Sequence, residues 1–125
     1  MRLILLLLPI LLLSDTNTDD SFLLEIEYGK MLYNNPRGIA CSKCHGKEGK
    51  GGQVISKYYD KNSNPKLLKG IDITHYSFEQ LKLSLENKFR DEKNHRVRHK
   101  IMPIYYLTDQ EIKAIHTYLK SVRDK

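Results

Sequence analysis

The residues with the clearest chemistry form one short segment, Cys41-Ser42-Lys43-Cys44-His45. Two thiols three residues apart on one helical turn can add to the two vinyl groups of one haem. The histidine that follows the second thiol is then held beside the iron as an axial ligand. The spacing therefore predicts a covalently attached haem c, with thioether bonds from Cys41 and Cys44 and iron ligation by His45.

Three other uses of two cysteines fit the sequence less well. A structural zinc site needs four ligands. The chain has no second C-x-x-C pair, and no ligand pair is recognisable among His75, His95, His99 and His116. A thioredoxin-type dithiol needs a βαβ context, which the sequence does not show. A disulfide within one turn would close a very small loop and would stabilise little.

A haem iron that takes one histidine has a sixth coordination position to fill. Beyond the first residue the chain has two methionines, Met31 and Met102. We expect Met31 to pack against other helices. Met102 precedes Pro103, and a proline prevents a regular helix and stiffens the backbone beside a ligand that approaches from a loop. Met102 is therefore the predicted sixth ligand. His99 and His95 are its rivals, and ordinary core packing is the other interpretation of Met102.

The elements that must position these residues are short of apolar side chains. Hydrophobic residues make up 40% of the 125, and 11 of them lie within residues 1–14. Only 39 remain among the following 111 residues, which is few for an independent core. This composition excludes a large enzyme. It also indicates that an apolar group other than protein, such as a buried porphyrin, completes the interior.

The first fourteen residues have the pattern of a secretion signal. Met1-Arg2 gives a positive start, and the apolar run from Leu3 to Leu13 spans about 16 Å as a helix. That is half of a ~30 Å hydrocarbon core, so no stable membrane span is expected. We predict a signal peptide at 1–14 without a clear cleavage site, a flexible segment at 15–20 and one domain at 21–125. The domain is expected to be exported to the periplasm, with a membrane tether if the signal stays uncleaved.

Helical periodicity predicts three helices in this domain. The first carries Phe22 to Tyr33 and ends at Asn34-Asn35-Pro36. The second and third begin at the capping boxes Ser77–Gln80 and Thr108–Glu111. Residues 46–53 are expected to form a glycine-rich loop, and no run alternates, so the predicted fold class is all-α. The predicted apolar stripes are Phe78, Leu81, Leu85 and Phe89, and then Ile112, Ile115, Leu119 and Val122.

Together these features resemble a class I (mitochondrial-type) cytochrome c of the bacterial, exported, single-haem kind. The matching landmarks run in family order from residue 21 to 122: Gly29-x-x-x-Tyr33, Cys41-x-x-Cys-His45-Gly46, Asn64-Pro65-Lys66-Leu67, Met102-Pro103, and Leu107 to Ile112 leading to Tyr118-Leu119. The resemblance implies a small cytochrome c fold of three to four helices around one covalently bound haem.

The resemblance also implies two close contacts. The terminal helices would cross at Gly29, where Tyr118 and Ile115 approach. Pro65 would supply the carbonyl that receives the Nδ1–H of the histidine ligand and so fixes its tautomer. The tyrosine pairs Tyr58-Tyr59 and Tyr105-Tyr106 are interpreted as walls of the haem pocket. His75 and His116 are expected at the surface.

A basic segment from Lys88 to Lys100 lies immediately before the predicted methionine ligand. It holds six Lys or Arg residues against two acidic ones, a net charge of +4. One interpretation is a solvated loop that offsets the haem propionates. The other is a docking face for an acidic redox partner or an anionic surface. The basic residues of this face are Lys88, Arg90, Lys93, Arg96, Arg98 and Lys100.

These observations favour an electron carrier over an enzyme, because a histidine and a methionine would fill both axial positions of the iron. Redox proteins are then the expected partners. One alternative is a haem-bearing electron-transfer subunit of a larger oxidoreductase. A weaker alternative is a gas- or peroxide-binding haem protein, in which Met102 is displaced from the iron. No motif for nucleic-acid binding is present.

Overall fold

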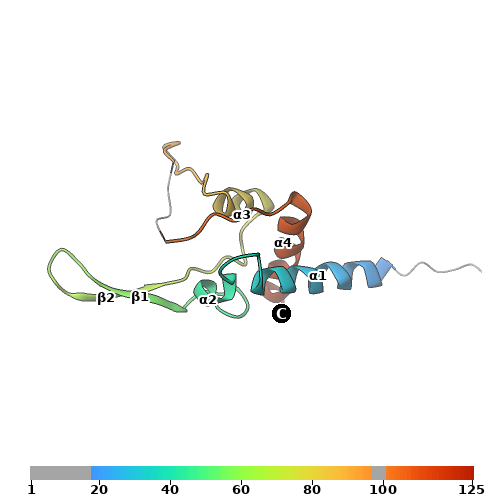
Figure 1. Cartoon of the computed structure of the whole chain (residues 1–125), viewed down its shortest axis with the longest axis horizontal. Coiled ribbons are helices and arrows are strands. Elements are labelled where there is room, and N and C mark those ends of the chain that lie inside the picture. Colours follow the sequence, from blue (N-terminus) through green and yellow to red (C-terminus); the bar gives the residue numbers. More distant parts are fainter. Residues whose placement is uncertain (1–17, 97–100) are drawn as a thin grey trace, which may run out of the picture.

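The computed structural model describes residues 18–96 and 101–125. The predicted signal peptide lies outside these ranges, as do Arg98, His99 and Lys100. The elements in Figure 1 are helices α1 (Thr18–Asn34) and α2 (Cys41–His45), strands β1 (Val54–Tyr59) and β2 (Pro65–Lys69), and helices α3 (Phe78–Leu85) and α4 (Asp109–Arg123). Helix α1 begins at Thr18, within the segment 15–20 that the sequence predicts to be flexible. Within the described ranges, no helix has the length and apolar character to cross a membrane.

Helices α1 and α4 pack across each other and form the main part of the helical body (Figure 1). They cross at Gly29, as predicted. A Cβ at this position would overlap the backbone carbonyl of Ala114 and would lie 3.0 Å from the Cβ of Tyr118. The predicted approach of Tyr118 is confirmed, and the backbone of Ala114 comes closest to Gly29. Any side chain at Gly29 would therefore push the two helices apart.

Both predicted capping boxes are present. The Ser77 hydroxyl accepts from the Gln80 N–H at 3.2 Å, and the Gln80 side chain accepts from the Ser77 N–H at 3.0 Å. Thr108 and Glu111 make the same reciprocal pair at the start of α4. These bonds satisfy N–H groups that have no partner within the helix. Helix α3 ends at Leu85, so Phe89, the last residue of the predicted stripe, lies beyond the helix.

A bidentate ion pair fixes the start of α4 to the segment between α1 and α2. The Arg37 guanidinium donates to both carboxylate oxygens of Glu111 at 2.8 Å, and to the Tyr106 carbonyl at 3.0 Å. Arg37 has a φ of 59°, a left-handed conformation that is unusual for a residue other than glycine. The hydrogen bonds from Arg37, together with the Thr108 N–H, lower the pKa of Glu111 to about 2.

The chain also contains an antiparallel hairpin, so the all-α expectation is wrong in this respect. Strands β1 and β2 pair in a two-stranded sheet, with Lys57 opposite Leu67 and Tyr59 opposite Pro65. Strand β1 reads Val-Ile-Ser-Lys-Tyr-Tyr, and β-branched and aromatic residues favour extended backbone. The sequence shows no alternation of apolar and polar residues here because neither face of this hairpin is buried, so the two strands were not predicted. The four helices agree with the expected number.

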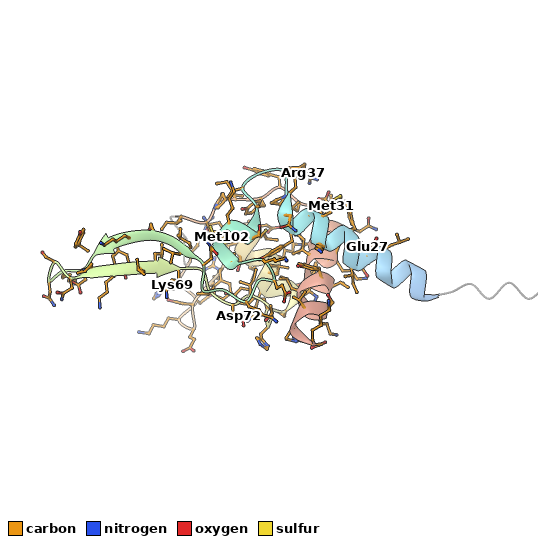
Figure 2. The ribbon with its side chains drawn as sticks, turned by 90° about the horizontal axis from the view of Figure 1, so that it is seen from below. Glu27, Met31, Arg37, Lys69, Asp72 and Met102 are labelled. Atoms are coloured by element: carbon orange, nitrogen blue, oxygen red, sulfur yellow. The ribbon has the colours of Figure 1, made fainter. Side chains whose placement is uncertain are left out.

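The buried core joins all four helices. Every residue of the predicted α4 stripe is buried. Tyr33 is fully buried, its ring lies 5.5 Å from that of Tyr118, and its hydroxyl donates to the Gly46 carbonyl at 2.6 Å. This bond fixes the loop that follows His45. Met31 is 57% exposed on α1, so the expectation that it packs against other helices is wrong (Figure 2).

Candidate functional site

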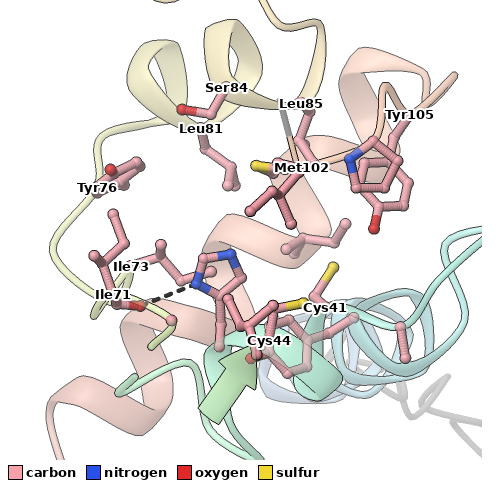
Figure 3. Close-up of a pocket in the computed structure, with 18 of the residues that line it drawn as sticks. Cys41, Cys44, Ile71, Ile73, Tyr76, Leu81, Ser84, Leu85, Met102 and Tyr105 are labelled. Atoms are coloured by element: carbon pink, nitrogen blue, oxygen red, sulfur yellow. Dashed lines mark hydrogen bonds between the residues drawn. The ribbon is translucent and has the colours of Figure 1, made fainter. Parts of the chain in front are cut away.

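Helix α2 is a single turn that presents two thiols to one cavity. Cys41 is the first residue of α2 and is buried, whereas Cys44 is half-buried; neither forms a disulfide. Both residues line the same cavity, and Figure 3 shows their sulfur atoms on its lower side. Burial raises the pKa of the Cys41 thiol to about 11. The C-x-x-C spacing thus brings the two thiols together, as one attachment site for a single group requires.

His45 ends α2 and lines the same cavity. Its Nδ1 lies 3.0 Å from the Ile71 carbonyl oxygen, the dashed line in Figure 3. Because a carbonyl only accepts, Nδ1 carries the proton and Nε2 keeps the lone pair that binds a metal. The expectation that Pro65 supplies this carbonyl is wrong. Pro65 is the exposed first residue of β2, where it pairs with Tyr59.

The segment that carries the Ile71 carbonyl passes directly over the backbone of α2. A Cβ at Gly70 would overlap the carbonyl of Cys44, so this close approach requires glycine. The Gly70 N–H donates to the Gln53 carbonyl at 2.9 Å, which extends the hairpin pairing down to α2. The base of the hairpin therefore sets the position of the Ile71 carbonyl relative to His45.

The cavity has a volume of about 280 Å³ and walls that are mostly apolar. This is close to the lower end of the ~300–1,000 Å³ found for small-molecule sites. Helix α3 contributes Leu81, Ser84 and Leu85, and the segment before α4 contributes Met102 and Tyr105. The walls thus come from segments far apart in the sequence, which lie together around the space above α2 (Figure 3).

Met102 lies across the cavity from the two cysteines (Figure 3). It is half-buried and packs against the core. Two hydrogen bonds fix the segment that follows it: the Tyr105 N–H donates to the Leu85 carbonyl at 2.9 Å, and the Tyr105 hydroxyl donates to the Ile39 carbonyl at 2.6 Å. Burial raises the pKa of Tyr105 to about 12, so its hydroxyl stays protonated and remains a donor. The thioether of Met102 therefore lies on a segment that hydrogen bonds hold against α3 and against the loop before α2.

A family model, Cytochrome c, matches residues 26–123 of the chain. The chain belongs to the cytochrome c family. As a cytochrome c it binds one haem c covalently, and membership supports a haem-based role in electron transfer. No curated protein and no solved structure gives a significant match.

The residues around the cavity of this cytochrome c fit a haem c. One turn offers two unpaired thiols, an imidazole with a free Nε2 stands beside them, and a thioether lies opposite. Apolar walls suit a porphyrin, which is largely apolar. In the described ranges, no three His, Cys, Asp or Glu side chains form a group able to hold a metal ion.

Three of the four tyrosines expected in the pocket lie outside it. Tyr105 lines the cavity, as predicted. Tyr106 is 86% exposed, because neighbouring residues on an extended segment point in opposite directions. Tyr58 and Tyr59 are exposed on the hairpin of this cytochrome c, so the expectation that they line the haem pocket is wrong.

Among the described histidines, those other than His45 do not line the cavity. His95 is exposed, and its Nδ1 lies 3.5 Å from a carboxylate oxygen of Asp91. His75 is exposed, as predicted. His116 is half-buried rather than at the surface, and its Nε2 lies 3.1 Å from the Tyr76 carbonyl.

Sequence reasoning missed several residues of the cavity wall. Ser84 lies three residues after Leu81 and one before Leu85, so helical spacing places it on the same face of α3. That signal was available. Ile71 lies in an irregular segment between β2 and α3, where no periodic pattern indicates which carbonyl faces the histidine.

Proposed function

We propose that this cytochrome c carries single electrons, with Cys41 and Cys44 holding the haem through thioether bonds and His45 and Met102 as the axial ligands. The position of Met102 across the cavity from α2 is the observation that carries the proposal (Figure 3). A histidine and a methionine on opposite sides leave no coordination position for a substrate. This arrangement favours an electron carrier over an enzyme.

The residues around the cavity have separate physical effects. The haem iron, when bound, supplies a one-electron redox couple. The Ile71 carbonyl accepts the Nδ1–H of His45, which fixes the tautomer and increases the basicity of Nε2. The thioether of Met102 and the apolar cavity walls both favour the less charged, reduced state, which raises the reduction potential.

The amino-terminal pattern supports an exported protein. Residues 1–14 join a positive start to a short apolar run, the pattern of a secretion signal. We therefore assign the domain to the periplasm, where it would meet redox partner proteins. If the signal is not cleaved, the same run would tether the domain to a membrane.

An apolar stripe on α1 favours a second candidate function, a haem-bearing subunit of a larger oxidoreductase. Leu24, Tyr28 and Met31 recur at helical spacing and are all exposed. A permanent partner would cover such a stripe. Size-exclusion chromatography of the protein purified from its source distinguishes the two functions, because a subunit elutes with its partner and a free carrier elutes alone.

Two measurements test the proposed ligands. Haem staining after denaturing electrophoresis should show haem that stays with the polypeptide. The oxidised protein should show the weak sulfur-to-iron charge-transfer band at the red end of the visible spectrum. Met102→Ala should abolish this band, lower the potential and let carbon monoxide bind the reduced iron. Met31→Ala is the matched control, because Met31 is exposed on α1, and it should leave the band unchanged.

Three outcomes would contradict this assignment. Haem removed by acid–acetone extraction would exclude the thioether bonds. A band that survives Met102→Ala would exclude Met102 as the ligand. A band that survives Met102→Ala but is lost in His99→Ala would instead make His99 part of the site.

A further inference from the structure

The hairpin extends away from the helical body (Figures 1 and 2). Of its strand residues, all but Ile55 and Leu68 are exposed. A two-stranded hairpin is only marginally stable alone in water. Exposed apolar strands also invite association. A surface of this kind therefore needs an explanation from function.

Both faces of the hairpin carry the same mixture of side chains. Residues paired across two antiparallel strands lie on the same face, and neighbours along a strand alternate. The pair Lys57–Leu67 therefore defines one face and the pair Tyr58–Lys66 the other. By alternation, the first face holds Lys57, Tyr59 and Leu67, and the second holds Tyr58, Lys66 and Leu68. Each face thus combines a tyrosine, a leucine and a lysine.

The positive charge of residues 54–69 is not neutralised within the described part of the chain. Their lysines are Lys57, Lys61, Lys66 and Lys69, and none of them takes part in an ion pair there. The one acidic residue, Asp60, accepts the N–H groups of Asn62 and Asn64 at 2.9 Å, so its carboxylate is used within the turn. The hairpin therefore presents positive charge to solvent on both faces.

The base of the hairpin is part of the haem site. Ile55 and Leu68 line the cavity, one from each strand. The chain leaves β2 through Gly70, which lies against the Cys44 carbonyl, and reaches the Ile71 carbonyl that holds His45. A protein that binds the hairpin is thereby brought beside the cavity wall.

We propose that the hairpin, residues 54–69, is the docking element through which this cytochrome c binds an acidic protein partner for electron exchange. The inference rests on the proposed electron-transfer function. Carboxylates of the partner pair with the four lysines and steer the encounter. Tyr58 and Tyr59 supply apolar contact area with few rotatable bonds, as tyrosines commonly do at the centres of interfaces.

The distribution of side chains favours a protein groove over the other possible occupants. A membrane is flat and contacts one face of a hairpin at a time, which would leave Tyr58 or Tyr59 in water. A second copy of the chain would bring the unpaired lysines of two hairpins together, and like charges repel. A groove with acidic walls covers both faces at once.

The basic segment before the predicted methionine ligand is less suited to this role in its described part. Lys88 pairs with Glu86 at 3.4 Å, and the Arg90 and Arg96 guanidinium groups donate to backbone carbonyls. The same stretch contains Asp91 and Glu92. Residues 88–96 thus carry a net charge of +2, against +3 for residues 54–69, and their arginines are already held by the chain, so we place partner docking on the hairpin instead.

Stopped-flow kinetics with a charged probe protein tests the inference. The reduced holo-protein is mixed with an oxidised, acidic blue copper protein at about 10 mM ionic strength, where the Debye length is about 30 Å. Lys57→Glu/Lys66→Glu should slow the second-order reaction at least about tenfold. The matched control, Lys88→Glu/Lys93→Glu, changes the charge equally and should slow it less than about threefold. Tyr58→Ser/Tyr59→Ser should also slow the reaction at about 150 mM salt, where charges are screened.

The neutral variant Lys57→Gln/Lys66→Gln guards against loss of hairpin structure and should give an intermediate rate. Equal slowing by the two Glu variants, or no slowing by either, would overturn the inference. A second outcome would also overturn it: the wild type binds phosphatidylcholine–phosphatidylglycerol vesicles, and Lys57→Glu/Lys66→Glu abolishes this binding without changing the rate of electron transfer. Visible spectra and midpoint potentials of every variant are recorded in parallel. If the proposed electron-transfer function is wrong, the wild-type protein will lack the spectrum and potential expected for histidine and methionine ligation. If docking alone is wrong, the wild-type spectrum and potential will be as expected and the variants will react at the wild-type rate.

Discussion

The Arg37–Glu111 ion pair should contribute measurably to the free energy of unfolding at neutral pH. The Glu111→Gln change removes the charge but keeps a side chain that can cap the Thr108 N–H. Hydrogen bonds to charged groups contribute about 1.5–3 kcal/mol, and exposed ion pairs about 0.2–1 kcal/mol. The Arg37 side chain is 57% exposed and that of Glu111 is 12% exposed. A loss of about 1 kcal/mol, at the upper end of the range for exposed ion pairs, is therefore expected.

The pH dependence of this contribution follows from the pKa of Glu111, which falls from the usual value of 4.5 to about 2 in the folded protein. A lowered folded-state pKa gives stabilisation that is fully present above the unfolded pKa. It is lost as the pH falls through the folded value. The difference between wild type and Glu111→Gln should therefore be complete at neutral pH and should shrink steadily between pH 4.5 and about 2.

Urea unfolding of the holo-protein, followed by circular dichroism, measures this difference at neutral and acidic pH. At neutral pH the variant should also melt about 4–8 °C below the wild type. Glu79→Gln is the control, because Glu79 is an exposed acid in the first turn of α3 with no ion pair among the described residues. A Glu111→Gln deficit that stays constant at every pH, or an equal deficit in Glu79→Gln, would refute the reasoning.

Three further predictions concern stability. Tyr33→Phe removes the 2.6 Å donor of the Gly46 carbonyl, which keeps the longer bond from the Gly49 N–H at 3.3 Å, and should lower the free energy of unfolding by about 0.5–1.5 kcal/mol, measured by urea titration. Gly29→Ala should prevent normal packing of α1 on α4 and lower the melting temperature sharply, whereas Gly38→Ala, whose Cβ would meet only an ordinary contact with Tyr105, should not. Without haem, Cys41→Ala/Cys44→Ala should show no cooperative thermal melt, because the cavity walls lose the apolar group that they pack against and only 39 of the 111 residues after the first fourteen are hydrophobic. A melt close to that of the holo-protein would contradict the last prediction.

Local signals were sufficient to predict the helices. The capping boxes at Ser77 and Thr108 located the starts of α3 and α4, and the stripe from Ile112 to Val122 identified the buried face. The capping boxes and the stripe depend on residues close together in the chain, which is why the sequence alone reveals them. The helix crossing at Gly29 was instead implied by the family resemblance, and a close backbone contact between distant segments explains why glycine stands there.

Other features depend on contacts that no local pattern encodes. The hairpin buries neither face, so it lacks the alternation that marks a half-buried strand. The carbonyl that holds His45 was assigned to Pro65, but the chain passes through β2 before it returns to α2, and Ile71 occupies that place. Met31 was expected to pack against other helices because it lies on the first helix, but its side chain is exposed there.

The burial of Cys41 has a consequence for the order of events in biogenesis. In the finished fold this residue is 8% exposed, and the backbone of Cys44 is covered by Gly70. The Cys41 thiol is therefore accessible to another protein only while the segment around α2 is open. We expect haem attachment to this thiol to precede the final packing of that segment.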